Sequence, residues 1–509
     1  METKKTKSVC PECFKEGKVK VIDAKREEED NAIYLKKTCD KHGDFKSIIS
    51  NDVEQYEKFQ DYWVDSTGVK NGKEVKDGCP HDCGICKDHK SQSVLTNLFV
   101  TNRCDLRCSY CFANVGAEGY VYEPSLKQLK KQMLQIRNEK PVGGKALQIT
   151  GGEPMIRDDI LDIIKMAKDV GFTHVQLNTN SIKLSENPDM VKKLREAGCN
   201  VLYMSFDGLT EENNPWLEQN KKTIENCRKA GMGIVLVPVV IKGVNDHQLG
   251  DIINFALENL DVIRGVNFQP VSFVGKIDKL KDKDRLKQRI SFSEVIKNVE
   301  EQLDGQLKKE DWYPPSFVRP ISKLVESIKG QKQVEFGCSP NCGSATYVFY
   351  ENGKIIPITD FVDVEGLMEY INKLSKKKGM MKKAKIAGSL MKNIRKYIDK
   401  DKSPESFSLS KIITNALTGG NYKDIGKFHK KSLYIGGMWF QDVWNLDLER
   451  LERCVIHYST PEGVIPFCSY NGLNYGQKIR KRNSMSIEEW EEKTGKNLKD
   501  DLWKGGRIS

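Results

Sequence analysis

Between residues 93 and 273, short apolar runs alternate with segments whose apolar residues recur every three or four positions. Short apolar runs predict buried strands, and the three-to-four spacing predicts amphipathic helices. The expected strands are Val94–Val100, Ala146–Thr150, His174–Leu177, Val201–Ser205, Ile234–Ile241 and Val266–Phe268. The expected helices are Ser125–Asn138, Asp158–Val170, Met190–Ala197, Thr223–Ala230 and Gln248–Asn259.

This alternation predicts an α/β fold with parallel strands. Six strand–helix repeats are typical of a partial (β/α)6 barrel of the TIM type, in which ligands lie at the carboxyl ends of the strands. A doubly wound open sheet is the alternative, because spacing alone does not separate the two. We place a Cys-rich metal-binding region at 1–90, the barrel at 91–300 and a C-terminal auxiliary-cluster domain at 301–509.

Composition narrows the class of protein. The 509 residues include 82 Lys and Arg against 71 Asp and Glu, a net charge of +11, which admits anionic partners. The longest apolar stretch, Gly233–Ile241, is less than half a membrane span. The N-terminus METKKTKSVC has no apolar segment of the secretory type, so we expect a cytoplasmic protein. Fifteen cysteines at tight spacings favour metal binding over disulfides.

The string TNRCDLRCSYCFAN offers Cys104, Cys108 and Cys111 on one short loop. Three thiolates on a [4Fe–4S] cluster leave one iron open, and an open iron can bind a small chelate. An apolar strand leads into this loop, and Gly151-Gly152-Glu153-Pro154 ends the next strand. The pattern therefore predicts a catalytic cluster.

These residues resemble the radical S-adenosylmethionine (SAM) superfamily. The resemblance implies a radical SAM barrel in which the open iron chelates SAM, and reductive cleavage yields methionine and a 5′-deoxyadenosyl radical. It implies Cys104, Cys108 and Cys111 as catalytic ligands and a low-potential electron donor such as ferredoxin or flavodoxin. The SAM-binding residues that it implies are Tyr110, Gly151, Gly152, Glu153, Asn178, Asn180, Ser205, Asp207, Val237 and Gln269. Any single Asn or Ser among them is also typical of a turn.

Two further cysteine groups predict auxiliary [4Fe–4S] clusters. Cys79, Cys83 and Cys86 repeat the same spacing after a polar turn, and either His81 or His89 could supply a fourth ligand. The second group, Cys338, Cys342, Cys454 and Cys468, offers four thiolates to one closed cluster. The alternative for Cys454 and Cys468 is a pair of core cysteines.

Cys10-x2-Cys13 with Cys39-x2-His42 has the spacing of a small tetrahedral site. Three thiolates and an imidazole suit zinc, and a mononuclear iron is also compatible. The N-terminal cysteines could instead be shared differently between a mononuclear metal and a cluster. Cys199 and Cys227 stand alone and are expected to be small buried hydrophobes.

Residues 373–402 form a basic amphipathic stretch. Its apolar residues recur at helical spacing, and its basic residues include Lys382, Lys383, Lys392, Arg395 and Lys396. Such a helix favours an anionic lipid surface. The alternatives are a solvated helix that covers a core, or a nucleic-acid contact.

The strings CPHDCGIC, RGVNFQP and CVIHYSTPEGVIPFCSYN resemble the archaeal tetraether lipid synthase group (GDGT and macrocyclic archaeol synthases). This resemblance implies C–C bond formation between terminal carbons of two isoprenoid chains, with a C–S intermediate on an auxiliary cluster. It implies an archaeal phospholipid substrate and a location at the inner face of the membrane, with no nucleic acid. One alternative is a radical SAM enzyme that modifies a peptide or transfers a methyl or sulfur group. The second is a non-catalytic iron–sulfur protein for electron transfer or nucleic-acid binding.

Overall fold

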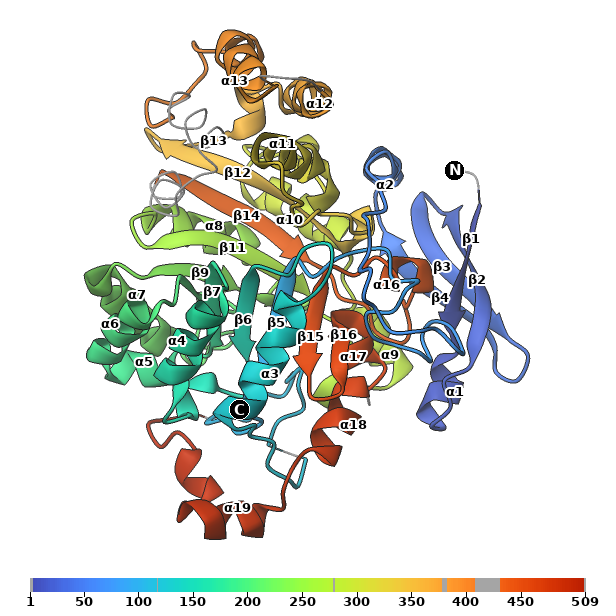
Figure 1. The fold of residues 1–509 in the computed structure, drawn as a ribbon, viewed down its shortest axis with the longest axis vertical. Coiled ribbons are helices and arrows are strands. Elements are labelled where there is room, and N and C mark those ends of the chain that lie inside the picture. Colours follow the sequence, from blue (N-terminus) through green and yellow to red (C-terminus); the bar gives the residue numbers. More distant parts are fainter. Residues whose placement is uncertain (1–2, 117, 278–279, 378–381, 408–430, 508–509) are drawn as a thin grey trace.

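The N-terminal part of the chain is a small antiparallel sheet, drawn in blue in the computed structural model of Figure 1. The structure describes residues 3–507 apart from 117, 278–279, 378–381 and 408–430. The sheet runs in the order β1 (Lys4–Val9), β2 (Val21–Glu29), β3 (Ala32–Cys39) and β4 (Gly43–Ser50). Two short helices, α1 (Pro11–Lys15) and α2 (Val53–Gln60), accompany it.

Six parallel strands form the centre of the main sheet, and they are adjacent in chain order. They are β5 (Leu95–Phe99), β6 (Ala146–Thr150), β7 (His174–Thr179), β8 (Val201–Ser205), β9 (Gly233–Val237) and β11 (Ile263–Pro270). The intervening helices are α3 (Leu126–Arg137), α4 (Ile160–Val170), α5 (Ile182–Glu186), α6 (Pro188–Ala197), α7 (Leu217–Ala230) and α8 (Leu249–Glu258). A sequential strand order is that of a barrel, whereas a doubly wound sheet reverses its order at a switch point. The predicted partial barrel is therefore confirmed.

The C-terminal region adds strands to both edges of this six-stranded centre. Strand β14 (Ser432–Met438) pairs in parallel with β11, and β15 (Ile456–Thr460) pairs in parallel with β5. A partial barrel leaves two rows of unpaired backbone groups at its edges, and these strands satisfy them. The antiparallel strands β12 (Gly343–Glu351), β13 (Lys354–Pro357) and β16 (Gly463–Pro466) lie outermost, and the short β10 (Val239–Val240) pairs with β11. The domain limits at 90 and 300 stay a prediction.

The remaining helices surround the sheet. They are α9 (Asp282–Gln288), α10 (Phe292–Gln302), α11 (Arg319–Lys329), α12 (Val364–Ser375), α13 (Lys382–Asn393), α16 (Leu448–Leu451), α17 (Phe467–Gly472), α18 (Tyr475–Arg482) and α19 (Ile487–Thr494). The 3-10 turns are η1 (Pro154–Ile156), η2 (Gly275–Ile277), η3 (Lys309–Asp311), η4 (Pro315–Val318), η5 (Pro340–Cys342), η6 (Ile358–Asp360), η7 (Ile394–Tyr397) and η8 (Leu498–Asp501).

The largest core lies between the sheet and helices α3–α8 and α10. Ile163, Leu194 and Ile252 are fully buried in it, as expected for the apolar positions of amphipathic helices. Cys199 and Cys227 are also fully buried there, which confirms their expected role as small hydrophobes.

The basic amphipathic stretch forms α13 and η7, at the top of Figure 1. Ile386 and Leu390 are buried in a cluster with Leu324, Ile371 and Leu374 of α11 and α12. These apolar side chains are buried against the protein and are therefore not available to insert into a lipid surface. The packing favours the alternative of a solvated helix that covers a core. The side chains of residues 378–383 lie outside those that the structure describes.

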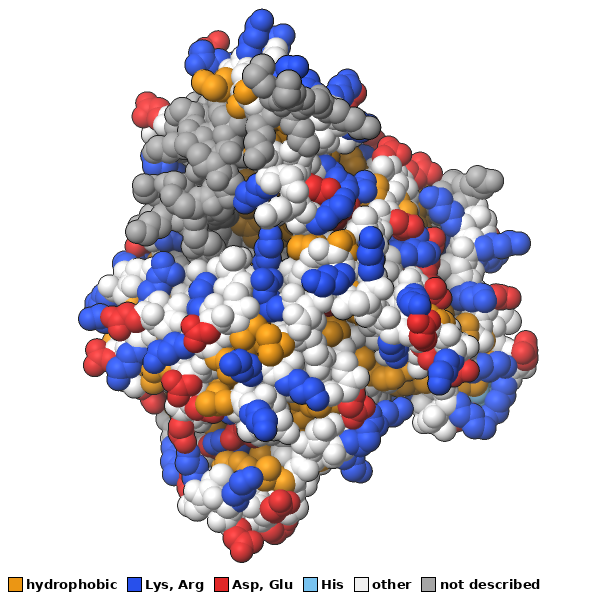
Figure 2. All heavy atoms as spheres, viewed as in Figure 1, with side chains coloured by type: hydrophobic (Ala, Val, Ile, Leu, Met, Phe, Trp, Pro, Cys, Tyr) orange, Lys and Arg blue, Asp and Glu red, His pale blue; other side chains and the backbone are white. Residues whose placement is uncertain are grey.

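On the face of Figure 2, the Lys and Arg side chains of the described residues are interspersed with Asp and Glu. Within the described ranges, the protein has no helix with the length and apolar character to cross a membrane.

Candidate active site and metal centres

The loop that carries Cys104 is held tightly against the end of β6. The N–H of Gly152 donates to Thr101 O (2.7 Å), and the N–H of Glu153 donates to Arg103 O (2.9 Å). A Cβ atom on Gly151 would lie 2.3 Å from Thr101 O, and one on Gly152 would lie 2.1 Å from Arg103 O. The Gly-Gly pair is therefore needed for the close approach of two backbones.

The opposite side of the loop is held by Gly275 and Lys276 of η2. The backbone N–H of Lys276 donates to Cys111 O (3.1 Å), and its Nζ donates to Cys108 O (3.0 Å). Gly275 has a φ of +66°, and a Cβ there would lie 2.4 Å from Cys111 O. Neither residue could be recognised from the sequence, because both stand at the start of a lysine-rich segment without a recognisable motif.

The three cysteines of the loop offer the thiols that an iron–sulfur cluster binds, and their role as its ligands stays a prediction. Cys104, Cys108 and Cys111 are all partly buried and pack beside apolar side chains. Burial raises the pKa of the Cys108 thiol to about 12, which describes the thiol without the iron that would bind its thiolate. Three thiols on one loop leave a position open on the cluster, as the sequence predicts.

Glu153 is 1% exposed, and its carboxylate is occupied by protein donors. It accepts hydrogen bonds from the N–H of Met155 (2.9 Å), the hydroxyl of Thr179 (2.9 Å) and the N–H of Asn180 (2.8 Å). Burial, with Asp105 nearby, raises the pKa of Glu153 to about 8. The structure thus shows Glu153 joining the ends of β6 and β7, and its contact with SAM stays a prediction.

The other predicted SAM residues lie on one rim because β7, β8, β9 and β11 are neighbours. Ser205 is exposed although it ends a central strand, and Val237 and Gln269 are half-buried, so the rim is open. Within the described part of the chain, the side-chain oxygen of Asn178 is buried without a hydrogen-bond partner. An open rim with an unsatisfied acceptor fits a ligand with polar groups such as SAM.

Tyr110 and Asp207 connect the cysteine loop to the end of β8. The hydroxyl of Tyr110 donates to Asp207 Oδ2 (2.6 Å), and Asp207 Oδ1 accepts from the N–H of Val239 (2.7 Å). Asn180 donates from Nδ2 to Asp105 (2.6 Å), directly after Cys104. Burial raises the pKa of Asp207 to about 6.

Two cavities flank the loop, and Lys276 lines both. The larger has a volume of about 570 Å³ and is lined by residues 108–110, with Trp216 and Ile241 opposite. The smaller has a volume of about 350 Å³ and lies between residues 112–114 and helices α17 and α18. Both volumes fall in the range of small-molecule sites, roughly 300–1,000 Å³.

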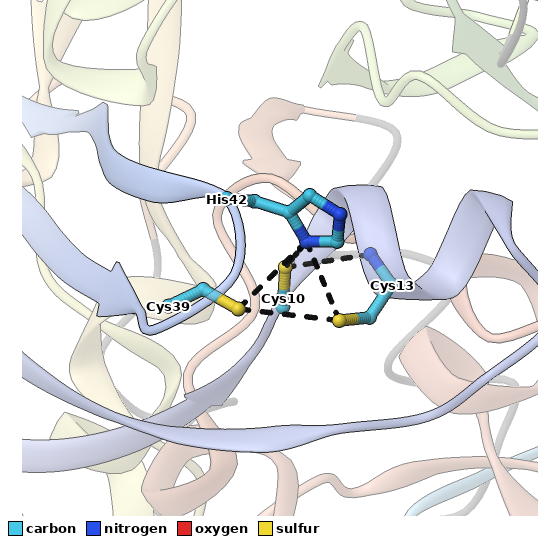
Figure 3. Close-up of side chains that lie close together, drawn as sticks. All are labelled: Cys10, Cys13, Cys39 and His42. Carbon is cyan, nitrogen blue, oxygen red and sulfur yellow. Dashed lines mark hydrogen bonds between the residues drawn. The ribbon is translucent and has the colours of Figure 1, made fainter.

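Cys10, Cys13, Cys39 and His42 converge on one point in Figure 3. His42 Nδ1 lies 3.4, 3.5 and 3.8 Å from the sulfurs of Cys10, Cys13 and Cys39, and the sulfurs of Cys13 and Cys39 are 4.0 Å apart. A tetrahedral metal with bonds of about 2.0–2.3 Å separates its ligands by about 3.5–3.8 Å. Glu16 lies 3.2 Å from the other ring nitrogen, where it can orient the imidazole. The predicted four-residue metal site is confirmed.

The second cysteine string also surrounds a cavity. Cys79, Cys83 and Cys86 line a space of about 40 Å³ together with His89, whereas His81 is exposed beside Cys79. His89 is buried, and its Nε2 already lies 2.9 Å from Cys454 O. A fourth ligand from His81 or His89 stays a prediction.

The third group comes together from three distant segments. Cys454 and Cys468 lie near each other and near Cys342, which in turn lies near Cys338. The Sγ of Cys454 donates to Ile456 O (3.0 Å), and the Sγ of Cys468 accepts from the N–H of Gln441 (3.3 Å). Arg450 donates from Nε to the sulfur of Cys342 (3.3 Å). No sequence motif predicts this contact.

The two predicted auxiliary sites are neighbours. Cys83 donates to the hydroxyl of Ser469 (2.7 Å), and Ser469 directly follows Cys468 on α17.

A buried polar network lies beside the third cysteine group, and no sequence motif predicts it. Ser93 donates to Glu139 (2.8 Å) and lies 2.9 Å from His457 Nδ1. His457 Nε2 lies 3.1 Å from His89 Nε2. Burial raises the pKa of Glu139 to about 7 and lowers that of His89 to about 4.

Comparison with known proteins identifies the family. Residues 98–256 match the model of the radical SAM superfamily, and residues 3–51 match that of the HMPTM N-terminal zinc ribbon domain. Over 501 residues the chain is 44% identical to 7,8-dihydro-6-hydroxymethylpterin dimethyltransferase of Methanocaldococcus jannaschii, which covers 96% of this chain and 97% of that protein. The chain belongs to the radical SAM superfamily, in the family of this relative. As a radical SAM protein it has a [4Fe–4S] cluster and SAM as its implied cofactors, and its N-terminal sheet is a zinc ribbon.

Two further matches of this radical SAM protein cover only part of the chain. A GTP 3′,8-cyclase of Marinobacter nauticus is 33% identical over 193 residues, 36% of this chain and 56% of the cyclase. The solved structure of methylornithine synthase is 14% identical with a TM-score of 0.30, over 39% of this chain and 60% of that one.

The comparisons do not support the expected tetraether lipid synthase, because the full-length relative is a pterin dimethyltransferase. The strings that suggested it lie in the Cys79 loop, β11, β15, β16 and α17. These segments mostly build the sheet and carry the auxiliary cysteines. They therefore reflect a shared scaffold more than a shared substrate.

Proposed function

We propose that this radical SAM protein is a methyltransferase that acts on a reduced pterin. The main support for this proposal is the 44% identity to 7,8-dihydro-6-hydroxymethylpterin dimethyltransferase along 96% of the chain. That match spans the zinc ribbon, the cysteine loop and the C-terminal helices together, whereas the cyclase matches only a barrel-sized segment. Methyl transfer is one of the alternatives that the sequence left open.

Methylation breaks a C–H bond of the pterin and forms a C–CH3 bond. The hydrogen atom would leave in 5′-deoxyadenosine, and the methyl donor would be released in its demethylated form. The low-potential reductant would supply the two electrons that this exchange consumes. When bound, the cluster and SAM supply the one-electron chemistry that breaks an unactivated C–H bond. Cys104, Cys108 and Cys111 would hold the cluster, and the open rim with Asn178 would bind polar groups of SAM.

The residues around the cysteine loop hold it in place. Gly152 and Lys276 fix it from opposite sides through backbone hydrogen bonds. Tyr110 ties it to Asp207 at the end of β8. Together, these three attachments hold the cluster ligands at a fixed distance from the strand ends where SAM would lie.

The two further cysteine groups would hold auxiliary clusters that pass electrons, since they adjoin each other at α17. A low-potential ferredoxin or flavodoxin is the proposed reductant. The zinc ribbon would bind zinc for structural reasons. Neither the comparisons nor the packing of α13 supports a phospholipid substrate or a membrane location.

The test is anaerobic reconstitution with iron and sulfide, followed by incubation with SAM, dithionite and 7,8-dihydro-6-hydroxymethylpterin in a cell extract that supplies the methyl donor. Mass spectrometry should find pterin heavier by one or two CH2 units. The Cys108→Ala variant should form no product, whereas Cys227→Ala, which removes a buried core cysteine, should retain it. A fully reconstituted wild-type protein that leaves the pterin unmethylated would refute the proposal.

A further inference from the structure

The smaller cavity beside the cysteine loop has the chemistry of a binding site for a flat, uncharged heterocycle. Its volume is about 350 Å³, and one wall begins at Phe112, the residue after Cys111. The opposite wall is formed by Tyr470 and the residues that follow it on α17 and α18. A ligand here would lie between the loop of the catalytic cluster and the helix that carries Cys468.

Aromatic rings on both walls are held in place by their neighbours. Phe112 packs against Phe467, with ring centroids 5.2 Å apart. Tyr470 is 2% exposed and stacks on Tyr458 at 3.8 Å. Rings fixed in this way can contact the face of a planar ligand without losing side-chain entropy.

Side-chain amides supply the polar part of the lining. Asn114, Asn474 and Gln477 line the cavity, and among the residues that the structure describes their side chains have no hydrogen-bond partner. Each amide offers donors and an acceptor side by side. That arrangement is complementary to a ring whose edge alternates N–H groups with carbonyl and ring-nitrogen acceptors.

The charges of the lining are already neutralised or engaged. Arg480 forms an ion pair with Glu118 (2.7 Å), and their side chains are 4% and 0% exposed. The Nε of Arg480 remains buried without a partner within the described chain. Lys276 donates its Nζ to Cys108 O. Since neither cation is free, the cavity suits a neutral heterocycle better than a phosphate.

We propose that this cavity is the pterin-binding site of the protein, with Asn474 and Gln477 recognising the edge of the ring. The assignment rests on the proposed function, because that function supplies a pterin as the substrate. The cavity begins directly after Cys111, so a pterin here would lie next to the loop that would hold the catalytic cluster.

The experiment measures binding of 7,8-dihydro-6-hydroxymethylpterin to the reconstituted protein by anaerobic equilibrium dialysis. The test variant is Asn474→Gly with Gln477→Met. Asn474 has a φ of +56°, which glycine adopts without strain, and Gln477 lies on α18, where methionine keeps the helix. The matched control is Asn352→Gly, since Asn352 has a φ of +54° in the exposed turn between β12 and β13.

We expect the Kd for the pterin to rise about 10-fold or more in the double variant, because two hydrogen bonds are lost. Binding of SAM and its reductive cleavage without pterin should stay within about 2-fold of the wild type, as should all values for Asn352→Gly. If the double variant loses iron or unfolds at a lower temperature than the wild type, the single variant Gln477→Met replaces it. We expect an intermediate rise in the Kd for the pterin in that variant.

Two results overturn the assignment, and they are distinguishable. If the wild type binds the pterin and the variants bind it equally well, or lose affinity for SAM instead, the site lies elsewhere and the proposed function stands. If the fully loaded wild type does not bind the pterin, the proposed function fails and the assignment fails with it.

Discussion

The contact between Gly152 and the cysteine loop gives a test of how precisely the catalytic ligands must be placed. A Cβ atom at position 152 would lie 2.1 Å from the carbonyl oxygen of Arg103. Real Cβ atoms stay at least 3.0 Å from such atoms, so in Gly152→Ala the loop must retreat by about 0.9 Å. The obstacle is backbone, next to Cys104, and no flexible side chain can yield instead.

A displacement of about 1 Å costs on the order of 100-fold in rate when geometry governs the reaction. We therefore expect Gly152→Ala to cleave SAM about 100-fold more slowly than the wild type in the presence of dithionite. The assay is the formation of 5′-deoxyadenosine by the anaerobically reconstituted protein, with iron and zinc measured on the same sample. Zinc should be unchanged, because among the described residues no backbone hydrogen bond joins the ribbon to this loop.

The matched control is Gly388→Ala on α13, where a Cβ would meet nothing within 4 Å. Alanine is favoured over glycine inside a helix by about 1 kcal/mol, so this variant should be as active and slightly more stable. Full activity of Gly152→Ala with a normal iron content would refute the reasoning, since it would mean that the loop has room to spare.

Three other variants probe the remaining features. Burial raises the pKa of Glu139 from 4.5 to about 7. The folded protein therefore keeps a proton that the unfolded chain has lost, so stability falls by about 3 kcal/mol as pH rises through this interval. Glu139→Gln should abolish that decline in denaturant titrations at pH 5 and pH 8, and an equal decline in both proteins would contradict it. Replacing Cys10 and Cys13 by Ala should remove the ribbon metal, seen by elemental analysis, and lower stability while SAM cleavage persists in part; unchanged metal content would exclude the site. Replacing Lys392 and Lys396 by Glu should leave binding to anionic liposomes and SAM cleavage unchanged, because α13 covers a core; weaker binding at low salt would restore the membrane interpretation.

Local patterns were enough for the central strands and the two main sites. Each of the six strands is a short apolar run between helical repeats, and its residues are neighbours in sequence as well as in space. The cysteine loop and the Cys10–His42 site are also set by short spacings. Such features could be predicted from the chain because their ligands come in pairs or triplets at spacings of two or three residues.

Contacts across long chain distances could not be predicted in this way. Strand β14 pairs with β11, and β15 returns to pair with β5, more than 350 residues earlier in the chain. Nothing in the sequence distinguishes Lys276 from the other lysines, and only the fold places its Nζ at Cys108 O. The role of Arg450 as a hydrogen-bond donor to Cys342 likewise follows only from the tertiary structure.

The sequence alone determined an α/β fold with parallel strands, a three-cysteine loop after the first of them and an N-terminal metal site, whereas the strand order of the structure decided for the barrel. The tertiary structure decided what covers each surface. An amphipathic pattern such as that of α13 is the same whether the helix lies on a membrane or on a protein core, and only the apolar partners on α11 and α12 distinguish the two. Periodicity records that one face is apolar, whereas the free energy of burying that face depends on neighbours that the fold brings from elsewhere in the chain.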